Sequence, residues 1–229
     1  PDNVHSPETV LTIGSYAFAN CKSLESVTIP SATDVLGNNA FSNCTSLKTA
    51  IISDGVGSIG ADVFDKCTAI ESITLPYAGD TLENVNQEDS RIYVISRLFD
   101  NKVIDKTYGA VCNGLTSYIP NSLKKITITG GTRIPTDAFN GFKSLTEINL
   151  PDTITSIGNN AFKDCAGLER ISFYGNAPSI SSNAFTKVTA TAYYQKDNKT
   201  WTSDVKQNYG GNITWNGVEL IKITKQPTN

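Results

Sequence analysis

The sequence predicts a β-rich solenoid of the α/β class, built from about seven repeats of 23 residues. Two observations support this fold: phenylalanines recur at a constant spacing, and a strand-like segment follows each of them. The phenylalanines with this spacing are Phe18, Phe41 and Phe64, and then Phe139, Phe162 and Phe185. Between the two groups lies an enlarged copy whose register phenylalanine is Phe99. A period of about 20–29 residues is typical of leucine-rich repeats.

Each repeat contains one short strand. In residues 24–29 the first, fourth and sixth positions are apolar, and Val27 and Ile29 alternate with Thr28. Alternation with a period of two indicates a strand that has one buried face. Pro30 follows, and proline ends a strand because it has no amide hydrogen to donate. Stacked repeats therefore form a parallel sheet along one face of the solenoid.

The opposite face is predicted to carry short helical or 3₁₀ turns and loops. In five repeats a residue type that favours helix N-caps stands three positions before the phenylalanine. These residues are Ser15, Asn38, Thr136, Asn159 and Ser182. The Ala-Phe-x-x-Cys segment is expected to form one such turn with Phe and Cys inside. Ala61 replaces the cap in the third repeat, which predicts a weaker turn there.

The repeated phrase resembles the BspA-type leucine-rich repeat of bacterial surface proteins. Residues 157–162 read Ile-Gly-Asn-Asn-Ala-Phe, and Cys165 and the strand of residues 168–173 follow. The resemblance covers residues 7–195 and departs from the pattern in the enlarged repeat and at Phe142, which replaces the Cys. It implies a secreted or cell-surface bacterial protein without catalytic activity that binds other molecules, in some members as an adhesin toward host matrix proteins.

The chain divides into four predicted parts. Residues 1–6 are a trimmed edge, and residues 7–195 form the solenoid, with the enlarged fourth repeat at 77–128. Residues 196–217 form a C-terminal cap, in which Trp201 seals the core. Residues 218–229 are a linker or the start of an immunoglobulin-like domain. Because solenoid ends need caps and the sequence contains no Met, we expect the chain to be part of a longer protein.

Composition excludes several functions. The net charge is −3, which gives no basic field for nucleic acid. No apolar run is long enough to span a membrane. His5 is the only histidine, and no Cys-x-x-Cys occurs, so neither a nucleophile–base pair nor a zinc site is predicted. We therefore expect no enzyme activity and no cofactor. The five cysteines are expected to be free thiols, buried at the repeat positions.

Candidate partner-binding residues lie at the outward positions of the strands and in the enlarged repeat. The second strand position alternates in charge if the strands stack in register, and such neighbours attract each other. The candidates are Glu25, Lys48, Glu71, Lys124, Lys125, Glu147 and Arg170 on the strands, and Tyr77, Tyr108 and Tyr118 in the fourth repeat.

The expected function is a protein-interaction or adhesion module that acts as a monomer. Its ligand is a protein or a glycan. Two alternatives remain open. A carbohydrate-binding module would use the tyrosines of the enlarged repeat or Trp201 as stacking surfaces, and a structural spacer would position neighbouring domains without binding a ligand.

Overall fold

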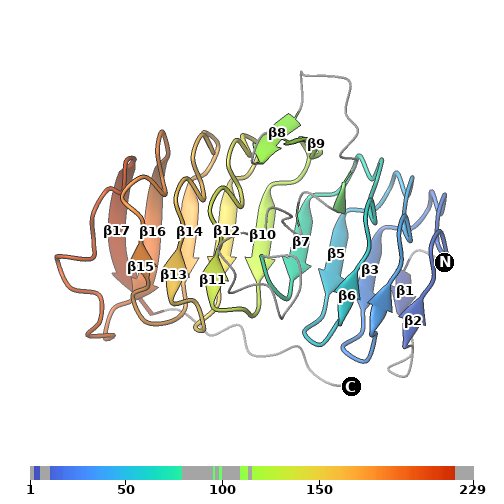
Figure 1. Ribbon diagram of the computed structural model, residues 1–229, viewed down its shortest axis with the longest axis horizontal. Helices are drawn as coiled ribbons and strands as arrows, with labels where there is room; N and C mark the ends of the chain where they lie inside the picture. Colours follow the sequence, from blue (N-terminus) through green and yellow to red (C-terminus); the bar gives the residue numbers. More distant parts are fainter. Residues whose placement is uncertain are drawn as a thin grey trace.

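The protein is a parallel β-solenoid in the computed structural model, with coils stacked side by side along its long axis (Figure 1). The structure describes residues 3–5, 11–78, 95, 98–99, 109–112 and 115–219. This architecture confirms the predicted solenoid of about seven turns of 23 residues.

Among the described residues, a nine-stranded parallel sheet forms one side of the solenoid. Consecutive repeats pair in register, with Ser26 opposite Thr49 and Thr49 opposite Ser72. In spatial order the strands are β1 (Asn3–His5), β3 (Ser26–Ile29), β5 (Thr49–Ile52), β7 (Ser72–Leu75), β10 (Lys125–Ile128), β12 (Glu147–Leu150), β14 (Arg170–Phe173), β16 (Thr189–Gln195) and β17 (Asn212–Val218).

Two three-stranded parallel sheets are built from the Ile-Gly segments, for which no strand was predicted. They are β2 (Thr12–Ile13), β4 (Val35–Leu36) and β6 (Ser58–Ile59), and β11 (Arg133–Ile134), β13 (Ser156–Ile157) and β15 (Ser179–Ile180). The glycine allows close stacking, because a Cβ at Gly158 would lie 2.5 Å from the backbone nitrogen of Thr136 in the preceding coil. In the fourth repeat, β8 (Gly109–Cys112) and β9 (Leu115–Tyr118) form an antiparallel hairpin.

The core contains a column of stacked phenylalanine rings. The ring centroids of Phe162 lie 5.2 Å from those of Phe139 and 5.3 Å from those of Phe185. Phe64 and Phe99 lie 6.5 Å apart, which confirms Phe99 as the register phenylalanine of the enlarged repeat. Phe142 is buried at the position that other repeats give to Cys. The apolar strand positions are also buried, as the alternation predicted.

The predicted helical turns are wrong in the regular repeats, whereas Ile95 and Leu98 of the enlarged repeat are helical. Within residues 11–78 and 115–219 no backbone is helical, and the segments around each phenylalanine are successive tight turns. The residues two before and two after Phe41, Asn39 and Asn43, have φ values of 56° and 60°. Residues with side chains avoid this left-handed region, and single residues there interrupt a helix.

Backbone hydrogen bonds join the turns of each coil to the turns of the next coil. Alternate amides donate to carbonyl oxygens one repeat further along, whereas the amides between them close local turns. In the first coil the donor and acceptor pairs are Tyr16 and Asn38, Phe18 and Ala40, and Asn20 and Ser42, at 3.0, 2.8 and 2.8 Å. A helix cannot make these bonds, because its amides donate within the helix.

The predicted N-caps have a different role for the same reason. The side-chain oxygen of Asn38 accepts a hydrogen bond from the Ala61 amide of the next coil at 2.8 Å. It therefore joins two coils and caps no helix. The weaker turn at Ala61 stays a prediction, since Ala61 has no side-chain acceptor of its own, although its amide is bonded to Asn38 of the preceding repeat.

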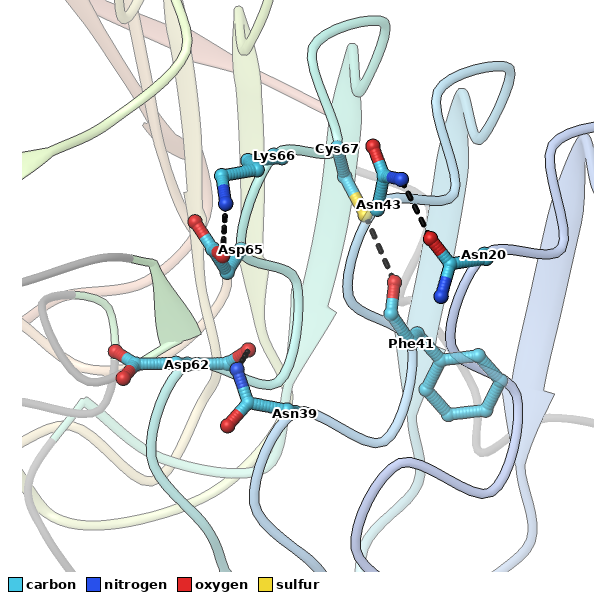
Figure 2. A network of polar contacts seen from close by, with 8 residues as sticks. All are labelled: Asn20, Asn39, Phe41, Asn43, Asp62, Asp65, Lys66 and Cys67. Atoms are coloured by element: carbon cyan, nitrogen blue, oxygen red, sulfur yellow. Dashed lines mark hydrogen bonds and ion pairs between the residues drawn. The ribbon is translucent and has the colours of Figure 1, made fainter.

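The thiols of the repeat positions also bond to neighbouring coils. Cys67 Sγ donates to the Phe41 carbonyl oxygen at 3.2 Å (Figure 2), and Cys44 Sγ donates to that of Phe18 at 3.2 Å. Cys44, Cys67 and Cys165 are free and buried, as predicted, but Cys21 is exposed. Cys21 belongs to the first coil of residues 11–78, so no described preceding coil covers it. Cys112 has its side chain outside the described part.

Both ends of the sheet differ from the expected elements. Residues 3–5, expected to be a trimmed edge, form β1 and pair with β3. At the other end, β16 pairs with β17, a strand that lies mostly within the expected C-terminal cap. Trp201 is 5% exposed, and its indole N–H donates to the Gly175 carbonyl at 3.1 Å. The domain boundaries remain a prediction, and residues 220–229 lie outside the described residues.

Replacing Phe162 by Ala is expected to lower the free energy of unfolding by about 3–5 kcal/mol, because it removes a fully buried ring from the middle of the column. Urea unfolding followed by circular dichroism measures the loss. Leu11→Ala, at a position 66% exposed, is the control and should change stability by less than about 0.5 kcal/mol. A loss below about 1 kcal/mol for Phe162→Ala contradicts a buried column.

Thiol reactivity is expected to separate Cys21 from the other repeat cysteines. In a Cys112→Ser background, an aromatic disulfide reagent should modify Cys21 in the folded protein and the others only after unfolding. Partial burial and the nearby Cys44 raise the pKa of Cys21. Its reaction rate should therefore keep rising above about pH 8.5, the ordinary thiol pKa. Rapid modification of Cys67 in the native state refutes this prediction.

Candidate interaction face

The strand face is defined here as the outward-pointing side chains of the nine-stranded sheet. Parallel register aligns equivalent positions of successive repeats into columns that run along the solenoid. The pairing continues across the enlarged repeat, where Ser72 lies opposite Lys125. The in-register condition for the predicted charge columns is therefore met.

The columns are numbered by position in the six-residue strand segment, so that Glu25 in residues 24–29 belongs to the second column. This column carries exposed charges. Lys48 and Glu25 form an ion pair with 3.5 Å between Nζ and Oε2. Their side chains are 52% and 55% exposed, so the pair contributes little to stability. Glu71 and Lys124 lie in the same column and are also exposed. Within the described residues neither of them forms an ion pair, which leaves both charges free to contact a partner.

The third column changes character along the solenoid. Its N-terminal half holds Ser26, Thr49 and Ser72, and the Ser72 hydroxyl lies 3.3 Å from that of Thr49. Its C-terminal half holds charges, beginning with an ion pair of 2.9 Å between Lys125 and Glu147. The third column therefore has a neutral hydroxyl-rich half and a charged half.

Glu147 is the centre of the charged half. It accepts hydrogen bonds from Lys125 at 2.9 Å and from the Asn149 amide at 3.0 Å. Burial by itself raises the pKa of this carboxyl, but the hydrogen bonds and the charges of Lys125 and Arg170 outweigh burial and lower the pKa. Glu147 is therefore ionised at neutral pH and engaged by its own sheet.

Arg170 follows Glu147 in this column and contacts an aromatic ring that the sequence analysis did not select. Its guanidinium carbon lies 3.9 Å from the centre of the Tyr193 ring. Tyr193 belongs to β16 and pairs in register with Ser172. Tyr193 could have been selected from the sequence. The alternation of residues 189–194, together with the register of the repeats, places Tyr193 in the outward fifth column.

The fifth column becomes buried in the charged half. Thr127, Asn149 and Ser172 are 8%, 4% and 0% exposed. The Asn149 amide also lies 3.3 Å from the Thr127 hydroxyl. These polar residues support the charged side chains beside them and offer little direct contact area.

The three candidate tyrosines do not form a surface in the described part of the chain. Tyr77 is completely buried, so it cannot contact a partner, and its inclusion among the candidates was wrong. Tyr108 lies outside the described residues. Tyr118 belongs to β9, and its side chain is not described. The other seven candidates belong to the strand face.

The turn side of the solenoid is polar but internally paired. Asn43 donates to the Asn20 side chain at 2.6 Å, Asn39 donates to the Asp62 carbonyl at 3.4 Å, and Lys66 lies 3.6 Å from Asp65 (Figure 2). Among the described residues no group of three or more His, Cys, Asp or Glu side chains is arranged to hold a metal ion. Of the contacts on the turn side, the two that involve asparagine side chains link adjacent coils.

The comparison with known protein families identifies the repeat. The family model of the BspA type leucine-rich repeat region matches residues 2–107 and 114–203, in six copies. The chain belongs to this family. Its fold is generally a non-catalytic scaffold for protein interaction. No curated protein sequence matches the chain.

Solved structures of bacterial leucine-rich repeat proteins are similar to the chain. A protein from Bacteroides ovatus ATCC 8483 is 21% identical, with 92% of this chain and 53% of that chain covered and a TM-score of 0.36. The leucine-rich repeat protein of T. pallidum is 20% identical, with 94% and 87% covered and a TM-score of 0.36. A leucine-rich cell surface protein from Faecalibacterium prausnitzii A2-165 is 22% identical, with 93% and 53% covered and a TM-score of 0.32.

The chain thus spans about half the length of the Bacteroides and Faecalibacterium chains. Within the residues that the structure describes, none lies in a helix with the length and apolar character needed to cross a membrane.

Replacing Glu147 by Gln is expected to lower the free energy of unfolding by about 0.2–1 kcal/mol at pH 7, the range of partly exposed ion pairs. Because the folded-state pKa is lowered, this stabilisation is present above the unfolded pKa of about 4.3 and disappears as the pH falls through the folded value. Urea unfolding at pH 7 and at acid pH measures it. A loss that stays the same in acid contradicts an ionic origin, and Glu25→Gln is the more exposed control.

Proposed function

We propose that the protein is an adhesion module of a secreted or cell-surface bacterial protein, and that it binds a protein partner through the strand face. Membership of the BspA-type family supports the surface setting. We further propose that the module acts as a monomer.

The observation that supports the strand face most strongly is a pair of exposed charges in the middle of its second column. On the strand face, Glu71 and Lys124 are exposed and make no ion pair within the described residues. Exposed polar groups on a flat, in-register sheet suit hydrogen-bonded contact with another protein.

The glycan alternative has lost two of its aromatic surfaces. Tyr77 is fully buried and Trp201 is 5% exposed, so neither ring offers a face on which a sugar can stack. A protein partner therefore remains the better-supported ligand class.

Obstruction of the strand face tests the proposal. Ser72→Trp places a large ring in the middle of the third column, between Thr49 and Lys125. Ser58→Trp is the matched control, because Ser58 is an exposed strand residue of β6, in one of the three-stranded sheets. Binding is measured by biolayer interferometry on immobilised fibronectin, fibrinogen, laminin and collagen.

We expect Ser72→Trp to reduce binding at least about ten-fold and Ser58→Trp to leave it unchanged, since a misplaced bulky group at a contact costs more than about 1.4 kcal/mol. Equal binding by both variants contradicts the strand face as the interface. Unaltered unfolding midpoints of both variants ensure that a loss of binding does not arise from loss of fold.

A further inference from the structure

Arg170 is held in a defined orientation on the strand face. Its side chain leans from β14 toward β16, and its guanidinium carbon lies 3.9 Å from the centre of the Tyr193 ring. A guanidinium stacked on an aromatic face keeps its plane while its edge remains able to donate hydrogen bonds. The contact with Tyr193 therefore restricts the orientation of the Arg170 side chain.

The donors of Arg170 have no acceptor within the described part of the protein. Its Cα partner Glu147 is 2.9 Å from Lys125 and accepts from Asn149, and it acts on Arg170 only through its charge. Elsewhere among the described residues, no oxygen accepts a hydrogen bond from this guanidinium. An arginine carries five N–H donors in a planar fork, and here that fork points to no partner of its own.

A second polar group beside Arg170 also has no partner. Ser172 is 0% exposed, and its hydroxyl makes no hydrogen bond. Ser172 is two residues from Arg170 on β14 and pairs in register with Tyr193. A buried hydroxyl without a partner destabilises a fold, but at 0% exposure Ser172 makes no direct contact with a ligand, so the binding group at this place is Arg170.

The charges around Arg170 restrict the class of anion that it can bind. Glu147 lies on the neighbouring strand β12, and Glu169 directly precedes β14. Both repel additional negative charge, and the net charge of the chain is −3. Phosphate- or sulfate-rich polymers bind through many cations at once, whereas Lys48 and Lys125 are already paired with carboxylates of the strand face. A single carboxylate needs only one guanidinium fork, which it engages with two parallel hydrogen bonds.

We propose that Arg170, oriented by Tyr193, binds an Asp or Glu carboxylate of an acidic segment in the protein partner. This inference rests on the proposed function, since it names the chemistry of the partner at the same face. Arg170 makes the contact, and Tyr193 is a positioning residue.

The test is a titration of the arginine side-chain signals by nuclear magnetic resonance, with a hexaglutamate peptide as the probe. We expect the Arg170 Nε–H signal to shift and saturate, while the signal of Arg133, on β11 of a three-stranded sheet, stays in place. Hexaglutamine, which has the same length and no charge, should produce no shift.

Three variants separate the hydrogen bonds of the guanidinium group from its positive charge and from the role of the Tyr193 ring. Arg170→Lys keeps the charge and loses the fork, and it should weaken hexaglutamate binding about ten-fold or more, as expected for a lost hydrogen bond to a charged group. Tyr193→Leu removes the ring and should also weaken binding. Tyr193→Phe removes only the hydroxyl and keeps the ring, so it should bind hexaglutamate like the unaltered protein. Weaker binding by Tyr193→Phe would mean that the hydroxyl, and not the ring, positions Arg170.

Equal titration of the unaltered protein and Arg170→Lys overturns the inference. So does a saturable shift with a heparin-derived oligosaccharide that hexaglutamate does not produce. The proposed function fails separately. If Ser72→Trp blocks partner binding but Arg170→Lys does not alter hexaglutamate binding, the strand face remains the interface and only the role of Arg170 is lost.

Discussion

The structure depends on hydrogen bonds that run from one coil to the next outside the main sheet. Residues such as Asn39 and Asn43 adopt left-handed backbone angles, which turn the amide of Phe41 toward the carbonyl of Val63 at 2.9 Å. The turn side is thereby tied coil to coil like the strands. Both sides of each coil are then fixed at the same spacing, and that spacing allows the phenylalanine rings to stack about 5–6 Å apart.

The core of this fold could be predicted from the sequence, because apolar periodicity reports burial directly. The positions of Phe162, Leu168 and Ile171 follow from the pattern alone, and all three are buried. The turns could not be predicted in the same way. Asn38 favours a helix N-cap and also a bridge to a neighbouring coil, and the choice depends on the Ala61 amide, a contact between residues 23 positions apart.

The strand face was predictable as a set of columns, but its internal pairing was not. Register follows from the repeat, so the outward positions of Lys125, Glu147 and Arg170 could be assigned from the sequence. The contact between Arg170 and Tyr193 requires side-chain conformations across two strands. The burial of Tyr77 was missed because it lies where the regular pattern stops, and composition alone made it look like part of an exposed insertion.

The enlarged fourth repeat has a consequence for how such a scaffold can change. Ser72 and its partner Lys125 are 53 positions apart, against 23 for Thr49 and Ser72, yet β7 and β10 pair in full register. Lengthening a loop between fixed ends costs only about 0.6 kcal/mol for each doubling. The coil junction after β7 is therefore an insertion site. New sequence can be acquired or grafted there while the neighbouring strands and their side-chain columns keep their spacing.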